Sequence, residues 1–120
     1  MQTFASSLAR WFPFSRGLRL ALLFAFSLTP VAQAADIAAG KAKASVACAV
    51  CHGALGQSMQ ANVPSLAGQP EVYLVEQLQH YRSGKRQHEV MSLMAKPLTA
   101  QDIENLAAWY AALKVEVSEP

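Results

Sequence analysis

Cysteine is scarce in this chain of 120 residues, which contains only two. Both stand in one short motif, so none remains elsewhere for a disulfide-stabilised scaffold. A long hydrophobic run is also missing: the apolar stretch from Leu20 to Leu28 is about half of the ~20 residues that cross a bilayer as a helix, and Pro30 interrupts it. Acidic residues are absent before Asp36, and internal repeats and low-complexity tracts are absent throughout.

The first 34 residues have the three-part pattern of a secretory signal peptide. Arg10, Arg16 and Arg19 precede the apolar stretch, and the small-residue triplet Ala32-Gln33-Ala34 follows it. We expect residues 1–34 to be a cleavable signal peptide and the remainder to be exported, with no stable membrane insertion after cleavage. The alternative is an uncleaved membrane anchor, which the short apolar stretch disfavours.

Removal of this segment changes the charge of the chain. The whole sequence has a formal net charge of +2, but three of its ten basic residues and none of its eight acidic residues lie in 1–34. Residues 35–120 therefore have a net charge of −1, and nothing supports nucleic-acid binding. We expect them to form one domain, and a chain of this size buries only about 60–65% of its unfolded surface. A large apolar cofactor at its centre would help it to fold.

Both cysteines stand in the run Cys48-Ala49-Val50-Cys51-His52. In a helix or tight turn, positions i, i+3 and i+4 share one face, so two thiols and an imidazole converge. This arrangement attaches a haem covalently, because each sulfur can add to a vinyl group while the imidazole binds the iron as its fifth ligand. We therefore predict one haem c, attached through Cys48 and Cys51, with His52 as a metal ligand.

An iron held by His52 alone would have an open sixth position, which a methionine thioether can fill. Met91 and Met94 are the candidates, and His/Met ligation raises the reduction potential of a haem iron. His80 or His88 would instead give a bis-histidine iron. Because His80 lies off the apolar stripe of its expected helix and His88 stands among polar residues, we expect both to face solvent. The methionine that is not a ligand would fill a gap in the core.

Helical periodicity dominates residues 35–120, and no segment alternates apolar and polar residues as a half-buried strand does. The predicted fold class is therefore all-α. Asp36 and Thr99 are suitable N-caps for the first and third helices. The expected helices span residues 36–50, 70–84 and 99–113, and the expected loops span residues 53–69 and 85–98.

Several motifs carry a resemblance to a known family. Residues 36–114 resemble the class I c-type cytochromes of the bacterial periplasm, most closely one half of their tandem two-haem members and the short single-haem members. The runs that match are CAVCHG at 48–53, VPSLAGQ at 63–69, YRSGKR at 81–86, LTAQDI at 98–103 and LAAWY at 106–110, together with Met91.

The resemblance implies a small cytochrome c fold, in which three main helices and loops wrap around one haem. It implies that Met91 is the sixth ligand. It also implies that the carbonyl oxygen of Pro64 accepts a hydrogen bond from the other ring nitrogen of His52, a contact that orients a ligating histidine. The expected location is the periplasm.

Two further positions bear on this resemblance. Gly40 costs some helix stability, so it marks a close approach by another helix. The resemblance implies that this partner is Trp109 or Tyr110 of the last helix. Leu55 departs from the pattern, because similar chains often carry an acidic residue there, and this changes the surface beside the haem edge rather than the ligation.

The leading interpretation is a one-electron carrier and not an enzyme. Redox partner proteins, including membrane-bound respiratory complexes, would dock transiently over the haem edge through a small interface. The alternative is an electron-transfer subunit of a larger dehydrogenase or oxidase complex. A peroxidase or gas-binding protein needs an open iron position, which a methionine ligand opposes.

Interpretations without haem are weaker. A thioredoxin-like redox pair needs a βαβ setting, which the sequence lacks. A zinc site needs four ligands, and only two cysteines exist. A disulfide between Cys48 and Cys51 would be a precursor formed before haem attachment.

Overall fold

The computed structural model describes residues 33–117 and residue 119. The expected signal peptide lies outside these residues, except for its last two positions. Within the described part, no helix combines the length and the apolar character that are needed to span a bilayer.

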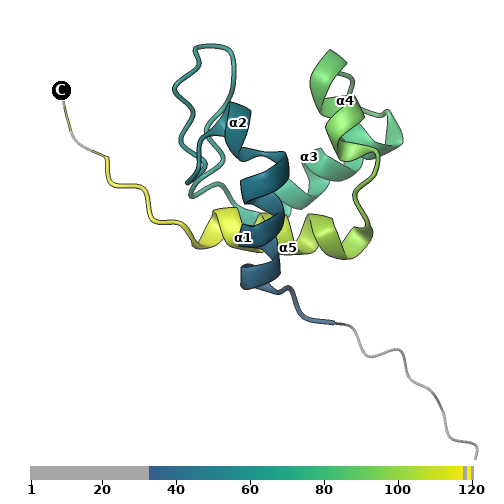
Figure 1. The fold of residues 1–120 in the computed structure, drawn as a ribbon, viewed down its shortest axis with the longest axis horizontal. Helices are drawn as coiled ribbons and strands as arrows, with labels where there is room; N and C mark the ends of the chain where they lie inside the picture. Colours follow the sequence, from purple (N-terminus) through teal and green to yellow (C-terminus); the bar gives the residue numbers. More distant parts are fainter. Residues whose placement is uncertain (1–32, 118, 120) are drawn as a thin grey trace, which may run out of the picture. The chain divides into compact units, whose positions relative to one another are not determined.

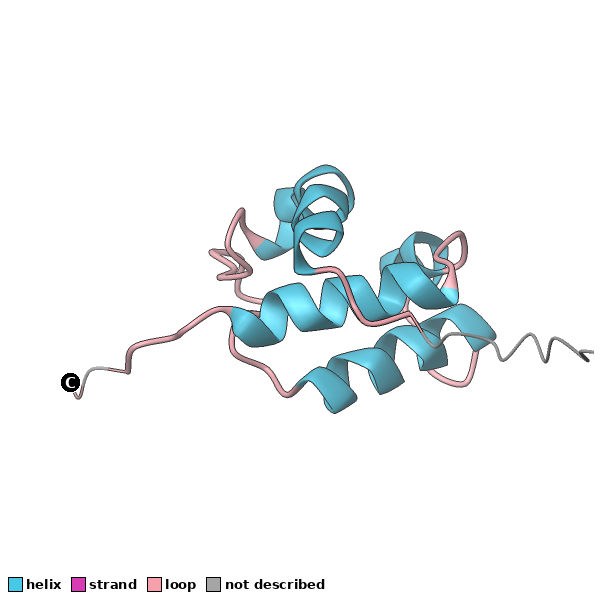
Figure 2. Cartoon of the chain, turned by 90° about the horizontal axis from the view of Figure 1, so that it is seen from below, coloured by secondary structure: helices cyan, strands magenta, loops and turns pink. Residues whose placement is uncertain are grey.

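Helices are the regular elements of this part of the chain, and residues 33–117 contain no strand. The helices are α1 (Ile37–Ala47), α2 (Ala49–His52), α3 (Glu71–Ser83), α4 (Glu89–Ala95) and α5 (Ala100–Ala112). They are connected by turns and loops (Figures 1 and 2). The predicted all-α fold class is confirmed.

Side-chain caps explain where the first and last long helices begin. The Asp36 carboxylate accepts hydrogen bonds from the N–H groups of Ala38 and Ala39 at 2.8 and 3.0 Å. At the start of α5, the Thr99 hydroxyl accepts from the N–H of Asp102, and the Asp102 carboxylate accepts from the N–H of Thr99, both at 3.0 Å. This reciprocal pair is a capping box, and it satisfies donors that the first helical turn leaves free.

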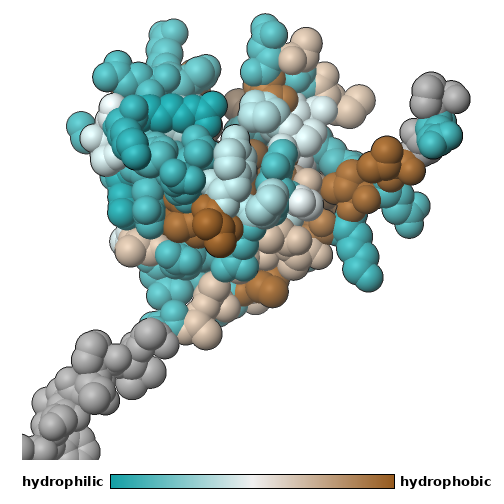
Figure 3. Space-filling view, turned by 180° about the vertical axis from the view of Figure 1, so that it is seen from behind, coloured by the Kyte–Doolittle hydropathy of each residue, from teal (hydrophilic) through white to brown (hydrophobic). Residues whose placement is uncertain are grey.

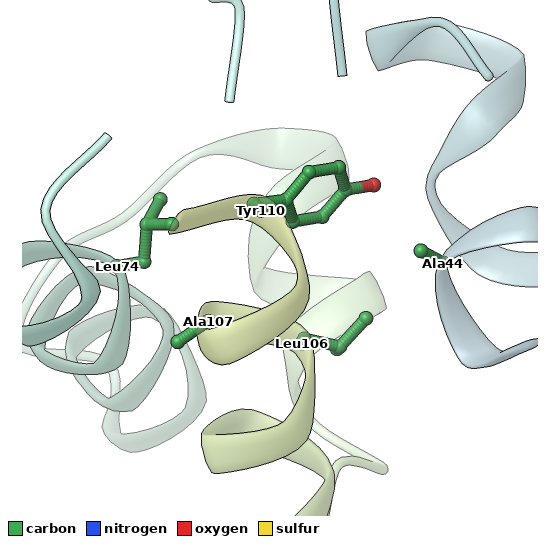
Figure 4. Close-up of a cluster of buried hydrophobic side chains, with 5 residues drawn as sticks. All are labelled: Ala44, Leu74, Leu106, Ala107 and Tyr110. Atoms are coloured by element: carbon green, nitrogen blue, oxygen red, sulfur yellow. The ribbon is translucent and has the colours of Figure 1, made fainter. Parts of the chain in front are cut away.

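Helix α5 lies at the centre of the described part, against α1 and α3. The buried apolar cluster consists of Ala44 from α1, Leu74 from α3, and Leu106, Ala107 and Tyr110 from α5. In Figure 4, Leu106 and Tyr110 extend toward the side of α1, whereas Ala107 faces α3. Helix α5 therefore contributes apolar side chains to the core on two faces, one toward α1 and the other toward α3.

Gly40 lies at the crossing of α1 and α5. It is buried, and a Cβ added to it would overlap the backbone carbonyl of Asn105 and touch the Cβ of Trp109. The close approach at Gly40 is thus confirmed, with Trp109 and the backbone of Asn105 as the partners. The Asn105 side chain also accepts a hydrogen bond from the N–H of Asp36 at 2.7 Å, so α5 holds the start of α1.

The predicted end of the first helix and the second predicted loop were both wrong. The first helix ends at Ala47, and Cys48 separates it from the short α2. The predicted loop over 85–98 contains α4, which begins after His88. No usual capping residue stands there, because the side chain that caps α4 is a histidine. The three longest helices remain those that were expected.

The outer surface is mixed in character. Figure 3 shows one face of the molecule, where apolar residues form separate patches among polar ones. The exposed large apolar side chains include three on or near the cysteine motif and three on α4: Val50, Leu55, Met59, Val90, Leu93 and Met94.

Candidate haem-binding site

The cysteine motif forms a tight helical turn. The carbonyl oxygen of Cys48 accepts hydrogen bonds from the N–H groups of Cys51 and His52 at 3.2 and 3.0 Å. Gly53 ends α2 with a φ of 82°, and a Cβ there would overlap the carbonyl of Gln57. This conformation favours glycine directly after the histidine. The turn therefore holds both thiols and the imidazole on adjoining positions of one short element.

His52 is buried, with an exposed fraction of 6%. Its Nδ1 lies 2.8 Å from the carbonyl oxygen of Pro64. Because a carbonyl oxygen can only accept, Nδ1 carries the hydrogen and donates it. The lone pair of a neutral ring is then on Nε2, which is the form of histidine that binds a metal. The contact also fixes the orientation of the ring.

The loop before α3 holds Pro64 in place through backbone hydrogen bonds. The carbonyl of Gly56 accepts from the N–H groups of Leu66 and Ala67 at 2.7 and 3.1 Å. The N–H of Gly68 donates to the carbonyl of Tyr110 at 2.9 Å, so the loop is tied to α5. The acceptor for His52 is therefore positioned both by hydrogen bonds within its own loop and by the connection of that loop to the core helix.

The two cysteines differ in their surroundings. Neither is in a disulfide, and Cys51 is exposed whereas Cys48 is half-buried against the apolar cluster. Burial raises the pKa of the Cys48 thiol, and a hydrogen bond with Tyr110 partly opposes that shift. Burial, followed by the charge of a Cys48 thiolate, raises the pKa of Tyr110 above its usual range. Cys48 and Tyr110 are thus neutral near pH 7.

Met91 and Met94 both lie on α4, three residues apart, so they share one side of the helix. Met91 is half-buried, whereas Met94 is 41% exposed. Figure 1 shows α2 and α4 on the same side of α5. A hydrogen bond connects His52 directly to Pro64, whereas Met91 lies on a separate element, α4.

The remaining histidines have other partners. His80 is half-buried, not fully solvent-facing as expected, and its Nε2 lies 3.7 Å from the Glu76 carboxylate. His88 is exposed, as expected, but its ring also caps α4. Reasoning from sequence missed this role, because histidine is not among the preferred N-cap residues. Among residues 33–117 and 119, no group of three or more His, Cys, Asp or Glu side chains could hold a metal ion.

The donor set fits a haem c. Two free thiols, an imidazole whose Nδ1 is engaged, and a half-buried thioether are the groups that attach and ligate such a cofactor. Comparison with known proteins agrees: a family model described as "Cytochrome c" matches residues 37–114. The chain belongs to the cytochrome c family.

Relatives of known name extend this result. The chain is 45% identical over 101 residues to cytochrome c4 of Pseudomonas aeruginosa, covering 83% of this chain and 50% of that protein. It is 38% identical over 82 residues to cytochrome c-554(548) of Halomonas halodenitrificans, covering 66% of this chain and 98% of that protein. A solved structure of reduced recombinant cytochrome c4 from Pseudomonas stutzeri has 40% identity and a TM-score of 0.64, covering 70% of this chain and 48% of that one.

The chain spans about half the length of the cytochromes c4 that it matches. Family membership confirms the cytochrome c fold and a covalently bound haem c, and Cys48 and Cys51 fit its attachment. Cytochromes c4 are electron carriers and not enzymes.

Proposed function

We propose that this protein is a one-electron carrier. Cys48 and Cys51 would hold its haem c covalently, and His52 and Met91 would ligate the iron. When bound, the haem supplies an iron that gains and loses a single electron. The observation that carries the proposal is the hydrogen bond between Nδ1 of buried His52 and the Pro64 carbonyl, because it presents Nε2 as a metal ligand in the turn that holds both thiols.

The chain's own residues keep the ligand set constant. His52 has a fixed ring orientation, and the hydrogen bond to Pro64 makes its Nε2 a better donor. Met91 supplies a soft thioether that favours the ferrous state. Its partial burial, compared with 41% exposure for Met94, supports Met91 as the ligand. With His52 and Met91 both bound to the iron, peroxide or a gas would have no open position to occupy.

We also propose that residues 1–34 are removed during export and that the mature protein works in the periplasm. Two observations support this boundary. The N-cap of α1 is Asp36, two residues after the expected cleavage position, and the family match begins at residue 37.

The proposed partners are redox proteins that dock transiently. One named relative is the "Thiosulfate dehydrogenase electron acceptor" of Thiomonas intermedia, 48% identical over 68 residues, which covers 56% of this chain and 31% of that protein. This favours a dehydrogenase as the electron donor, and it is the observation behind the second candidate, a haem subunit of a larger complex. Gel filtration of the native protein from its own cells distinguishes a free carrier from a subunit.

Optical spectra of the purified holoprotein test the ligation. We expect the oxidised protein to show the weak band at the red end of the spectrum that reports an iron–thioether bond. Met91→Ala should remove this band, because no thioether then reaches the iron. Met94→Ala is the matched control and should retain it. A Met91→Ala protein that keeps the band, or a Met94→Ala protein that loses it, would show that the ligand assignment is wrong.

A further inference from the structure

A histidine side chain begins the helix that carries Met91. His88 has an extended backbone, with φ −158° and ψ 134°, and is the N-cap of α4. Its Nδ1 accepts hydrogen bonds from the backbone N–H groups of Val90 and Met91 at 3.2 and 3.3 Å. Nδ1 therefore carries no hydrogen, and in the neutral ring the hydrogen is on Nε2. One of these two N–H groups thus belongs to Met91, the proposed iron ligand.

The cap is closed from the other side by Ser92. Its Oγ accepts a hydrogen bond from the N–H of His88 at 3.0 Å, and its own N–H donates to the carbonyl of His88, also at 3.0 Å. The two residues therefore hold the first turn of α4 reciprocally, in the way that a capping box does. The imidazole takes the part that a serine, threonine or aspartate side chain usually plays.

Helix α4 has little else to keep it folded. It has seven residues, and helices of this length are unstable by themselves. It packs against α3, but Ala95 is its only buried residue. Three of its large side chains are exposed: Val90, Leu93 and Met94. The start of α4 therefore depends on its cap more than the start of a long, well-buried helix does.

We propose that His88 is a positioning residue for the sixth ligand of the haem iron. By holding the N–H groups of Val90 and Met91, it keeps the first turn of α4 in the conformation that presents the Met91 thioether. Without the cap, this turn opens more often and the thioether leaves the iron more often. The inference rests on the proposed ligation by Met91.

Imidazole added to the ferric holoprotein measures this opening. It binds the iron only when the thioether has left, so its apparent affinity rises in proportion to the open fraction. His88→Ala should raise the apparent affinity about fivefold, within a range of roughly two- to thirtyfold, which is the usual effect of losing an N-cap. His88→Asn should restore the parent value, because a carboxamide oxygen accepts the same hydrogen bonds. His80→Ala is the matched control, since His80 caps no helix, and it should leave the affinity unchanged.

Urea unfolding of the same variants separates positioning from general stability. If His88 only stabilised the fold, His88→Ala would lower the midpoint of unfolding without changing imidazole affinity in native buffer. That result would overturn the proposal, as would a failure of His88→Asn to restore the parent affinity. If His88→Ala gives no folded holoprotein, the same comparison of imidazole affinity and unfolding midpoint is made with Ser92→Ala. It removes the opposite half of the cap and should raise the affinity about twofold.

Met91→Ala distinguishes a failure of this inference from a failure of the proposed ligation. If the iron–thioether band survives in Met91→Ala, the ligation is wrong and His88 positions nothing. If the band is lost in Met91→Ala but imidazole affinity is unchanged in His88→Ala, the ligation stands and the role of His88 is overturned.

Discussion

At the residue scale, Gly40 occupies a position that has room for a hydrogen atom but not for a side chain. It lies inside α1, where replacement of glycine by alanine ordinarily stabilises a helix by about 0.5–1 kcal/mol. The space at this position decides otherwise, because a Cβ would overlap the backbone carbonyl of Asn105. A backbone group cannot move aside as the end of a flexible side chain can, so steric overlap outweighs the helix preference.

We therefore expect Gly40→Ala to destabilise the holoprotein. Overpacking of a tight site costs about 1–3 kcal/mol, which exceeds the gain in helix preference. Urea unfolding followed by circular dichroism gives the free energy of unfolding. Gly84→Ala is the control: Gly84 has a φ of 83° but nothing within 4 Å of an added Cβ. It should cost only the strain of a left-handed backbone, about 1 kcal/mol. Equal stability of Gly40→Ala and the parent would contradict the tight crossing.

At the scale of elements, the start of α5 is tied to both its own backbone and α1. The Asp102 carboxylate accepts from the N–H of Thr99 at 3.0 Å and from its hydroxyl at 2.8 Å. Its other oxygen lies 3.0 Å from Nζ of Lys43 on α1. The hydrogen bond from the Thr99 backbone, followed by the one from Lys43, holds the pKa of Asp102 below its usual value. The Asp102 carboxylate therefore connects the start of α5 to α1, the helix that α5 crosses.

This shift predicts a pH dependence of stability. Because the pKa of Asp102 is lower in the folded protein, its contribution is complete above about pH 4, the usual value for an unfolded aspartate. The contribution is lost as the pH falls through the depressed pKa of the folded state. We expect the stability difference between the parent and Asp102→Asn to be greatest near pH 7 and to shrink below pH 4. Urea unfolding of both proteins from about pH 7 to pH 3 measures it, and a difference that does not change with pH would contradict the prediction.

The cap itself offers a second comparison for α5. Thr99→Ala removes the hydroxyl that accepts from the N–H of Asp102 and should cost about 1 kcal/mol in the free energy of unfolding. Thr99→Ser keeps an oxygen in that position and is the matched control. If both variants lose the same stability, the hydroxyl does not cap α5.

At the scale of the whole molecule, the small size of the core limits how much apolar burial stabilises the fold. Ile103 and Leu106 are the largest side chains that are fully buried among the described residues. Most other buried apolar residues are alanines, and alanine removes little apolar surface from water. A core this small makes only a modest contribution to stability, and a covalently bound cofactor would add to it.

We expect the double variant Cys48→Ala with Cys51→Ala to yield little folded protein, because it cannot hold the haem by covalent bonds. Far-UV circular dichroism and resistance to limited proteolysis measure folding, and acid–organic solvent extraction shows whether colour stays with the chain. The parent protein should keep its colour after extraction. A double variant that is helical and as resistant to protease as the parent would contradict a core built around the cofactor.

The sequence by itself determined the chemistry and the local starts of helices. The run from Cys48 to His52 specified haem attachment, since the spacing alone places three reactive groups together. Asp36 and Thr99 specified where α1 and α5 begin, because a cap acts on residues within one turn. These features depend on near neighbours in the chain, so they could be predicted without the fold.

The tertiary structure decided the contacts that support that chemistry, which the sequence indicated only through its resemblance to a family. The acceptor for His52 is twelve residues away and is held by a loop tied to Tyr110, and Gly40 meets a backbone group on a helix from the other end of the chain. Helix α4 was missed because seven residues with a histidine cap have little helical preference of their own. In each case the deciding energy comes from groups that folding brings together, and local sequence does not contain it.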